Sequence, residues 1–190
     1  MKQYKALLYF VVINVILSCS AQDRSYKNYN NKLSELIEAQ TLDESAISVL
    51  IDKSNHKLTV LIDTLIVKEY PVVFGGNPVD DKLKQGDRCT PEGKFRMLSK
   101  YPHKSWSKFI WINFPNNDSW EKHNQAKQDG KIPKDANIGG EIGIHGVPEN
   151  MDILIDLKYN WTLGCISLKN KDVDEIYPYI TENTIIEIRK

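Results

Sequence analysis

The segment AISVLIDKSNHKLTVLIDTLIVKEYPVVF, residues 46–74, carries the clearest secondary-structure signal in the chain. Its apolar residues alternate with other residues in two runs, which are Ile47, Val49 and Ile51, then Leu58, Val60 and Ile62. Alternation with a period of two is typical of strands with one buried face. The polar turn at residues 53–56 separates the runs, so we predict a hairpin, followed by a third strand between Leu65 and Phe74.

Outside this segment, the pattern predicts a mostly β fold with a few short helices. Further strands are predicted at residues 94–98, 109–114, 142–146 and 184–188. One helix is predicted at 117–128 with Ser119 as its N-cap, and another at 172–179, beginning with a capping box from Asp172 to Glu175. Strands and helices do not alternate regularly, which argues against a doubly wound parallel sheet.

Residues 1–21 have the organisation of a signal peptide. Lys2 and Lys5 precede an apolar run at residues 6–17, and small residues follow it. This run is shorter than the roughly 20 residues that a spanning helix needs. Cys19 follows Ile16-Leu17-Ser18 as in a lipobox, although a general signal peptidase could instead cleave after Ala21. We therefore expect export to the periplasm or cell envelope, with Cys19 as the candidate lipidation site and a lipid anchor as the only membrane contact.

The rest of the chain is predicted to form a tether and a single domain. Residues 22–45 are expected to form a polar tether with a short helix around Leu33, Leu36 and Ile37, and residues 46–190 to form the domain, which we expect to be monomeric. The 190-residue chain balances 25 basic against 25 acidic side chains, for a formal net charge of +0. It has no basic field to hold a polyanion, so nucleic acid is not an expected partner.

Cys165 is the candidate nucleophile. It follows Thr162-Leu163-Gly164, and a glycine at this place lets a substrate carbonyl approach backbone N–H groups that could form an oxyanion hole. A cysteine nucleophile also needs a base, which an imidazole can supply. An inert core thiol remains the simpler reading of Cys165 taken alone.

His145 is the candidate base, because it ends a strand that looks buried and precedes Gly146. A buried structural histidine remains the alternative. The other histidines are expected at the surface: His56 in a turn, His103 in a loop and His123 on a solvated helix. Among the tryptophans, we expect Trp161 to form a cleft wall beside the nucleophile and Trp111 to pack in the core.

Cys89 lies in a polar turn before Thr90-Pro91-Glu92-Gly93. In an oxidising compartment a disulfide between Cys89 and Cys165 is the simple alternative to a free nucleophile. The different local contexts of the two cysteines favour a free Cys165 and a Cys89 that packs in its turn. A secreted redox protein is a further alternative, but the chain has no Cys-x-x-Cys motif.

Taken together, the Thr-Pro-Glu-Gly loop at 90–93, His145-Gly146 and Thr162-Leu163-Gly164-Cys165-Ile166 resemble the motifs of the L,D-transpeptidase catalytic domain of the YkuD type. The resemblance covers about residues 46–188. It implies a largely β structure with mixed sheets, peptidoglycan stem peptides as substrate, and neither metal nor organic cofactor. It also implies that Cys165 is acylated and that His145 is its base. Gly164 and Cys165 would supply oxyanion-hole amides, with Thr162 and Gly146 as candidates for shaping the same loop region.

The sequence departs from the family pattern at three positions. Ser167 stands where arginine is common, Leu163 stands where histidine is frequent, and Thr162 replaces serine. We expect Ser167 and Trp161 to be candidate substrate contacts. Three cations near the motifs are expected to be solvated unless folding brings one into the site: Arg88, Lys158 and Lys169.

These departures leave three functions open. The first is acyl transfer through a Cys165 thioester, which forms 3-3 crosslinks or attaches proteins. The second is hydrolysis of wall peptides by an L,D-carboxypeptidase or amidase, because the loop at 86–93 is similar to that of a hydrolysing subgroup. The third is a wall-binding module with reduced catalysis, motivated by Ser167 and Leu163.

Overall fold

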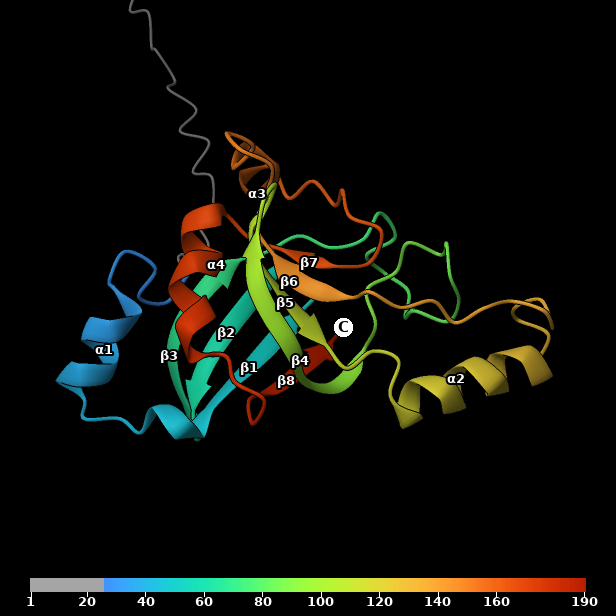
Figure 1. Ribbon diagram of the computed structural model, residues 1–190, viewed down its shortest axis with the longest axis horizontal. Helices are drawn as coiled ribbons and strands as arrows, with labels where there is room; N and C mark the ends of the chain where they lie inside the picture. Colours follow the sequence, from blue (N-terminus) through green and yellow to red (C-terminus); the bar gives the residue numbers. More distant parts are fainter. Residues whose placement is uncertain (1–25) are drawn as a thin grey trace, which may run out of the picture.

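The computed structural model describes residues 26–190 and contains a curled mixed sheet of eight strands with four short α-helices around it (Figure 1). The strands are β1 (Ile47–Asp52), β2 (Lys57–Ile62), β3 (Leu65–Pro71), β4 (Gly93–His103), β5 (Ser107–Ile112), β6 (Gly143–His145), β7 (Ile166–Ser167) and β8 (Ile185–Arg189). The helices are α1 (Leu33–Ala39), α2 (Asn117–Gln128), α3 (Ile153–Asp156) and α4 (Asn170–Ile176). Two 3-10 turns complete the described part, at Glu44–Ala46 and Tyr177–Tyr179. The predicted mostly β fold is confirmed.

The sheet has the order β3-β2-β1-β8-β4-β5-β6-β7. Its β1–β8 and β6–β7 pairs are parallel and its other pairs are antiparallel. The predicted hairpin forms as β1 and β2, with Val49 opposite Val60. The last strand, β8, lies between β1 and β4 rather than at an edge, and the C-terminus accordingly ends against the middle of the sheet (Figure 1).

The core lies on the inner face of the sheet and under α4. Alternate residues of β1 (Ile47, Val49 and Ile51) are at most 4% exposed, which confirms the face that the period-two pattern predicted. Ile144 and Ile166, opposite each other on β6 and β7, are both 0% exposed. The two strands that lead to the candidate site are therefore anchored in the core.

Several sequence expectations differ from the structure at element boundaries. Strand β4 runs to His103, well past the predicted end at residue 98. The N-cap of α2 is Asn116, whose side chain accepts the Ser119 N–H, so Ser119 is not the cap. The predicted capping box is also wrong, because α4 already begins at Asn170 and its N-cap, Lys169, makes no side-chain capping bond.

Residues 26–31, expected to belong to a tether, pack against the domain instead. The Tyr29 hydroxyl donates to Asp172 Oδ2 at 2.8 Å, and the Lys27 N–H donates to Glu69 Oε2 at 3.0 Å. Helix α1 follows, with Leu33 and Ile37 buried as their helical spacing predicted. The expected signal peptide, Cys19 and residues 22–25 lie outside the described residues. None of the helices within residues 26–190 combines the length and the hydropathy of a membrane-spanning segment.

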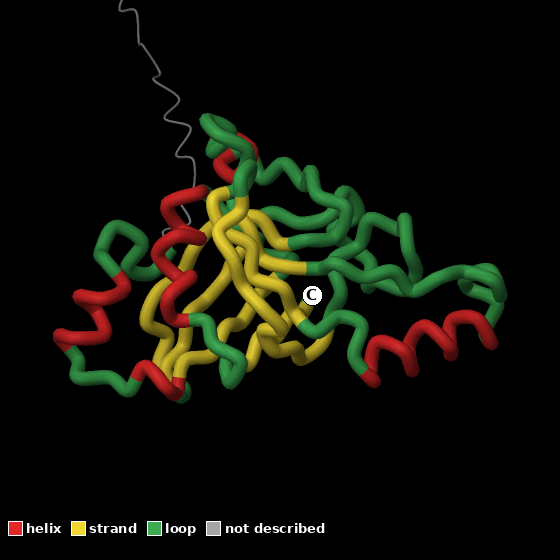
Figure 2. Tube along the Cα trace, in the orientation of Figure 1, coloured by secondary structure: helices red, strands yellow, loops and turns green. Residues whose placement is uncertain are grey.

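Long loops gather on the side of the sheet that faces α2 (Figure 2). The loop between β3 and β4 is tied to the β1–β2 hairpin by Lys53, whose Nζ lies 2.7 Å from Glu92 Oε1 and 2.8 Å from the Asp80 carbonyl. It is tied to α2 by Lys122, whose Nζ lies 2.6 Å from Asp81 Oδ2. These contacts hold the loop beside the ends of β6 and β7.

Candidate active site

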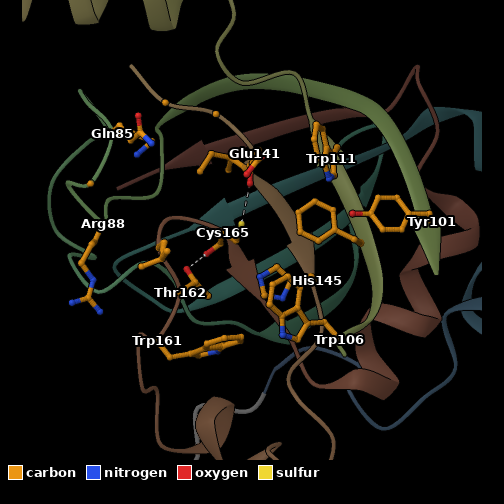
Figure 3. Close-up of a pocket in the computed structure, with 17 residues that line it drawn as sticks. Gln85, Arg88, Tyr101, Trp106, Trp111, Glu141, His145, Trp161, Thr162 and Cys165 are labelled. Carbon is orange, nitrogen blue, oxygen red and sulfur yellow. Dashed lines mark hydrogen bonds between the residues drawn. The ribbon is translucent and has the colours of Figure 1, made fainter. Parts of the chain in front are cut away.

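A cavity of about 1040 Å³ opens between the β3–β4 loop, the segment before β6 and the segment before β7. Cys165 and His145 both line it (Figure 3). The other residues used below that line it are Lys82, Gln85, Gly86, Arg88, Tyr101, Trp106, Phe109, Trp111, Glu141, Trp161 and Thr162. The two sequence motifs therefore meet in one pocket, as the candidate roles of their residues require.

Cys165 is partly exposed and lies in a loop that the Thr162 side chain organises. The Thr162 hydroxyl donates to the Cys165 carbonyl at 2.7 Å and accepts the Gly164 N–H at 3.1 Å. Gly164 has a φ of 143°, a conformation that favours glycine. The Cys165 Sγ donates to the Glu141 carbonyl at 3.5 Å. Local backbone geometry thus presents the thiol to the cavity.

Backbone segments pack against this loop with no room for side chains. An ideal Cβ on Gly75 would lie 2.1 Å from the Arg88 carbonyl oxygen and 3.0 Å from Gly164 Cα. One on Gly164 would lie 2.7 Å from the Cys89 carbonyl oxygen. The Gly76 N–H also donates to the Thr162 carbonyl at 3.1 Å. Glycines at 75 and 164 therefore allow three segments to touch beside the nucleophile.

His145 ends β6 and is 1% exposed. Its Nδ1 lies 2.6 Å from the Gly146 carbonyl oxygen. A carbonyl can only accept, so this contact places the proton on Nδ1 and leaves Nε2 as the basic nitrogen. The backbone next to it is also fixed, since the Gly146 N–H donates to the Trp106 carbonyl at 3.0 Å. Gly146 therefore orients the base and does not donate to an oxyanion.

Aromatic rings enclose the His145 imidazole. Trp106 stacks on one face with ring centroids 4.4 Å apart, and Phe109 lies parallel to within 9° at 5.5 Å. Trp161 meets the imidazole edge-on at 5.6 Å. His103 stacks on Trp106 at 4.4 Å, so it is part of the aromatic wall rather than an ordinary loop residue. These contacts restrict the imidazole to one orientation.

Burial changes the acidity of both candidate catalytic groups. Burial raises the pKa of the Cys165 thiol to about 11, although the Gly143 amide partly opposes this change. Burial lowers the pKa of His145 to about 4, with the Gly146 carbonyl opposing it. The free protein therefore holds a neutral thiol and a neutral imidazole near pH 7.

Several expected site residues lie elsewhere than the sequence indicated. Ser167 is 0% exposed, and its hydroxyl donates to the Gly146 carbonyl at 3.1 Å, so it does not face a substrate. The Gly164 N–H is taken by Thr162 and is not free for an oxyanion. Trp161 lines the cavity as expected.

The expectations for Trp111 and His123 are both wrong. Trp111 also lines the cavity, which corrects its placement in the core. His123 is 1% exposed, because the β3–β4 loop covers α2 and brings the Leu83 carbonyl to 2.6 Å from His123 Nδ1. No local pattern indicated either contact, since both depend on residues distant along the chain.

Both described cysteines are free thiols in the structure. Cys89 is buried, and its sulfur donates to the Asp87 carbonyl at 3.4 Å within its own turn. Of the three cations near the motifs, Arg88 lines the cavity, whereas Lys169 pairs with Asp156 at 2.5 Å and Lys158 is exposed. Among residues 26–190, no group of three or more acidic, histidine or cysteine side chains could hold a metal ion.

Comparison with known proteins gives one family. The model of the YkuD family, described as the L,D-transpeptidase catalytic domain, matches residues 46–188. No curated protein matches the sequence.

Solved structures with the same fold come from several bacteria. The helical cell shape determining protein Pgp2 from Campylobacter jejuni is 23% identical with a TM-score of 0.57, over 76% of this chain and 48% of that one. Bd1075 from Bdellovibrio bacteriovorus is 22% identical with a TM-score of 0.52, over 76% and 48%. An L,D-transpeptidase from Mycobacterium smegmatis is 16% identical with a TM-score of 0.51, over 76% and 59%. The chain thus spans about half the length of the first two.

Proposed function

Because the chain belongs to the YkuD family of L,D-transpeptidase catalytic domains, we propose that it is a cysteine-dependent acyl transferase acting on peptidoglycan stem peptides. The observation that carries this proposal is the meeting of Cys165 and His145 in one cavity, with Nε2 as the basic nitrogen of the imidazole. A nucleophile, an oriented base and a backbone-lined loop are the parts that acyl transfer through a thioester needs.

In the first step, the Cys165 sulfur attacks the carbonyl carbon of an L-centred residue in a stem tetrapeptide. His145 Nε2 takes the thiol proton and then delivers it to the leaving amine, so a C–S bond forms as the C–N bond breaks and D-alanine departs. The neutral starting pair supports proton transfer that accompanies attack rather than a thiolate formed beforehand.

Backbone donors stabilise the oxyanion in this step. Since Thr162 occupies the Gly164 N–H, the donor that we assign to the oxyanion is the Cys165 N–H of the nucleophile itself, for which the structure shows no acceptor among the described residues. Thr162 acts indirectly, because its bond to the Cys165 carbonyl fixes the plane of the loop.

In the second step, an amine attacks the thioester, His145 takes its proton, and the sulfur regains a proton as the new amide forms. This gives a 3-3 crosslink or a protein attachment. Water in place of the amine would make the protein an L,D-carboxypeptidase or amidase, and failure to form any thioester would leave a wall-binding module.

Mass spectrometry of disaccharide tetrapeptide incubated with the protein tests the proposal. We expect dimeric products that lack one D-alanine, and a thioester adduct on Cys165. Cys165→Ala should abolish both, whereas the matched control Cys89→Ala should retain them, since Cys89 does not line the cavity. Tripeptide alone would replace transfer by hydrolysis, and no product from tetrapeptide or sacculi would contradict an enzymatic role.

The place of action follows from the same proposal. The protein is exported as a monomer to the periplasm or cell envelope, where a lipid on Cys19 holds it at a membrane surface. Mass spectrometry of the mature N-terminus checks this: a diacylated Cys19 supports the anchor, whereas a free N-terminus at Gln22 would replace lipidation by ordinary signal-peptide cleavage.

A further inference from the structure

The segment between β6 and β7 exposes a group of apolar side chains. Its short helix α3 lies at the periphery of the domain, away from α1 and α2 (Figure 1). Ile153 and Leu157 are four residues apart and share one side of this helix. Grouped apolar side chains on a surface mark interaction sites, whereas single ones are ordinary. We call the group the α3 patch, and its members are Met151 (39% exposed), Ile153 (51%), Leu157 (70%) and Tyr159 (61%).

The opposite side of the same segment fixes the α3 patch in place. Ile155 is 1% exposed and packs in a small core cluster beneath the helix. Asp156 pairs with Lys169 at 2.5 Å, and Asp152 Oδ1 accepts the Asn170 N–H at 3.4 Å. These contacts hold α3 in one orientation, so its apolar side chains stay turned outward.

The charges around the α3 patch are nearly balanced. Glu149 and Lys158 are both exposed at its margin and have opposite signs. The Asp156 carboxylate is already paired with Lys169. A surface with little net charge does not attract a polyanion or a strongly charged peptide. The patch therefore suits a partner that accepts apolar side chains.

The N-terminal end of the described chain lies next to α3. The Tyr29 hydroxyl donates to Asp172 Oδ2 at 2.8 Å. Burial raises the pKa of this hydroxyl, and the nearby charges of Asp172, Asp156 and Asp152 raise it further. The rings of Tyr26 and Tyr29 are 6.1 Å apart. The chain thus enters the domain at residue 26 on the side that carries the α3 patch.

A short stretch of sequence separates this entry point from the proposed lipid anchor. Seven residue steps lead from Cys19 to Tyr26, and they span at most about 25 Å when fully extended. A lipid on Cys19 would therefore keep the side of the domain around residue 26 close to the bilayer. The α3 patch lies on that side.

We propose that the α3 patch binds the surface of a lipid bilayer. This inference rests on the proposed place of action, since it names the face that the anchored domain turns toward the membrane. Apolar side chains of a surface segment insert at the boundary of headgroups and acyl chains, where the amphipathic side chains of Tyr159 and Lys158 also fit. The lipid on Cys19 raises the local concentration of the patch at the membrane, and the patch fixes the orientation of the domain.

Amide hydrogen exchange of the Cys19-lipidated protein tests the contact. The protein is measured on vesicles of phosphatidylethanolamine and phosphatidylglycerol and compared with unlipidated Cys19→Ser protein in buffer. We expect residues 149–160 to exchange several-fold more slowly on the vesicles, because lipid covers them. Residues 63–64 are the internal control, since they precede β3, whereas Tyr29 contacts Tyr70 near the other end of that strand. Unchanged exchange at 149–160, or equal slowing at 63–64, would overturn the inference.

Vesicle partition measures the size of the effect. In the chain from residue 19 onward, Cys19→Ser removes the anchor, so binding comes from the domain itself. Adding Ile153→Ser and Leu157→Ser should lower the partition coefficient roughly tenfold to a hundredfold, because two exposed aliphatic side chains lose their contact with lipid. The matched control adds Leu65→Ser and Ile185→Ser, which are 41% and 42% exposed at the starts of β3 and β8.

The control should partition like its parent, and equal urea midpoints of the two double variants would show that both are folded. Equal partition of the patch variant and its parent, or equal losses in patch variant and control, would refute binding by the α3 patch. Slower exchange at 149–160 that requires a high protein concentration but no vesicles would assign the patch to a second copy and also overturn the inference.

These outcomes are separate from those of the proposed function. Turnover of a soluble tetrapeptide does not involve the α3 patch, so its absence would count against the enzymatic proposal alone. A mature N-terminus at Gln22 would remove the lipid anchor, and the partition of the unlipidated chain would still decide whether the patch binds lipid.

Discussion

The base and the nucleophile are held by different kinds of contact. His145 ends a strand and is enclosed by the rings of Trp106 and Phe109, so side chains fix it. Cys165 lies in a loop that touches other segments through Gly75 and backbone atoms. Ring packing can be weakened gradually by substitution, whereas backbone contact leaves no space for one methyl group. The nucleophile side should therefore be the less tolerant of change.

Gly75→Ala is the largest expected effect. The added Cβ would lie 2.1 Å from the Arg88 carbonyl oxygen and 3.0 Å from Gly164 Cα, so the β3–β4 loop or the Cys165 loop must shift to make room for it. We expect a loss of about 3 kcal/mol in the free energy of unfolding, the upper end for overpacking, and loss of activity. Denaturant unfolding measures it, with Gly140→Ala as the control, because a Cβ there meets nothing within 4 Å. Equal free energies of unfolding for the two variants would contradict the expectation that the nucleophile loop tolerates substitution less than the surroundings of His145 do.

The pH dependence of Cys165 alkylation tests whether the two sides are coupled before substrate binds. Only the thiolate reacts, and the thiol pKa of about 11 lies above the ordinary value of 9.0. We expect the rate with iodoacetamide, measured on Cys89→Ala protein, to rise about tenfold per pH unit from about pH 7 to about pH 10. A plateau near neutral pH would instead indicate a thiolate paired with protonated His145.

Thr162→Val tests how far one side chain supports the nucleophile loop. The change removes the bonds to the Cys165 carbonyl and the Gly164 N–H, which together stabilise the loop by about 1–3 kcal/mol. We expect kcat to fall roughly tenfold, since about 1.4 kcal/mol corresponds to a factor of ten in rate. Thr162→Ser should restore it. A valine variant with full activity would show that the backbone contacts at Gly75 and Gly164 hold the nucleophile loop without the Thr162 hydroxyl.

Ser167→Ala is the smallest expected effect and concerns the base. Without the Ser167 hydroxyl, the Gly146 carbonyl accepts only from His145 Nδ1, which favours the protonated imidazole. We expect the His145 pKa to rise by less than about one unit, as followed by NMR titration. An unchanged or lower His145 pKa would show that the Ser167 hydroxyl does not influence the base.

The same variant has a consequence for stability. The folded His145 pKa of about 4 is below the ordinary 6.5, so the unfolded chain binds more protons between these values. The contribution of His145 to stability is therefore full above pH 6.5 and falls as the pH drops toward 4. Ser167→Ala should reduce this loss, which urea unfolding at about pH 7 and about pH 4.5 would measure.

Local pattern was enough to predict the fold class, and the family motifs added Cys165 and His145 as candidates that prove to line one cavity. Alternation identified β1 and β2, and the short motifs around His145 and Cys165 identified candidates for one pocket. Contacts between distant segments were not predictable in this way. Trp106 reaches His145 only through the pairing of β5 with β6, and His123 is buried only because a loop 40 residues earlier covers it.

The sequence pattern also could not predict which neighbouring groups form hydrogen bonds or contacts with one another. The sequence placed Gly164 beside the nucleophile, but not the Thr162 hydroxyl on its N–H. It placed Arg88 near a motif, but it did not indicate that the Arg88 guanidinium lies against the Gly76 backbone. Both depend on side-chain orientation in the folded chain, which periodicity does not specify.

The central position of β8 has a consequence for how the chain is made. Residues 185–189 are translated after the other seven strands, yet they pair with both β1 and β4 in the middle of the sheet. A ribosome or a translocation channel that still holds this segment prevents the two halves of the sheet from joining. The domain must therefore wait, incompletely folded, until nearly all of its residues have emerged, which suits the export through a channel that we propose.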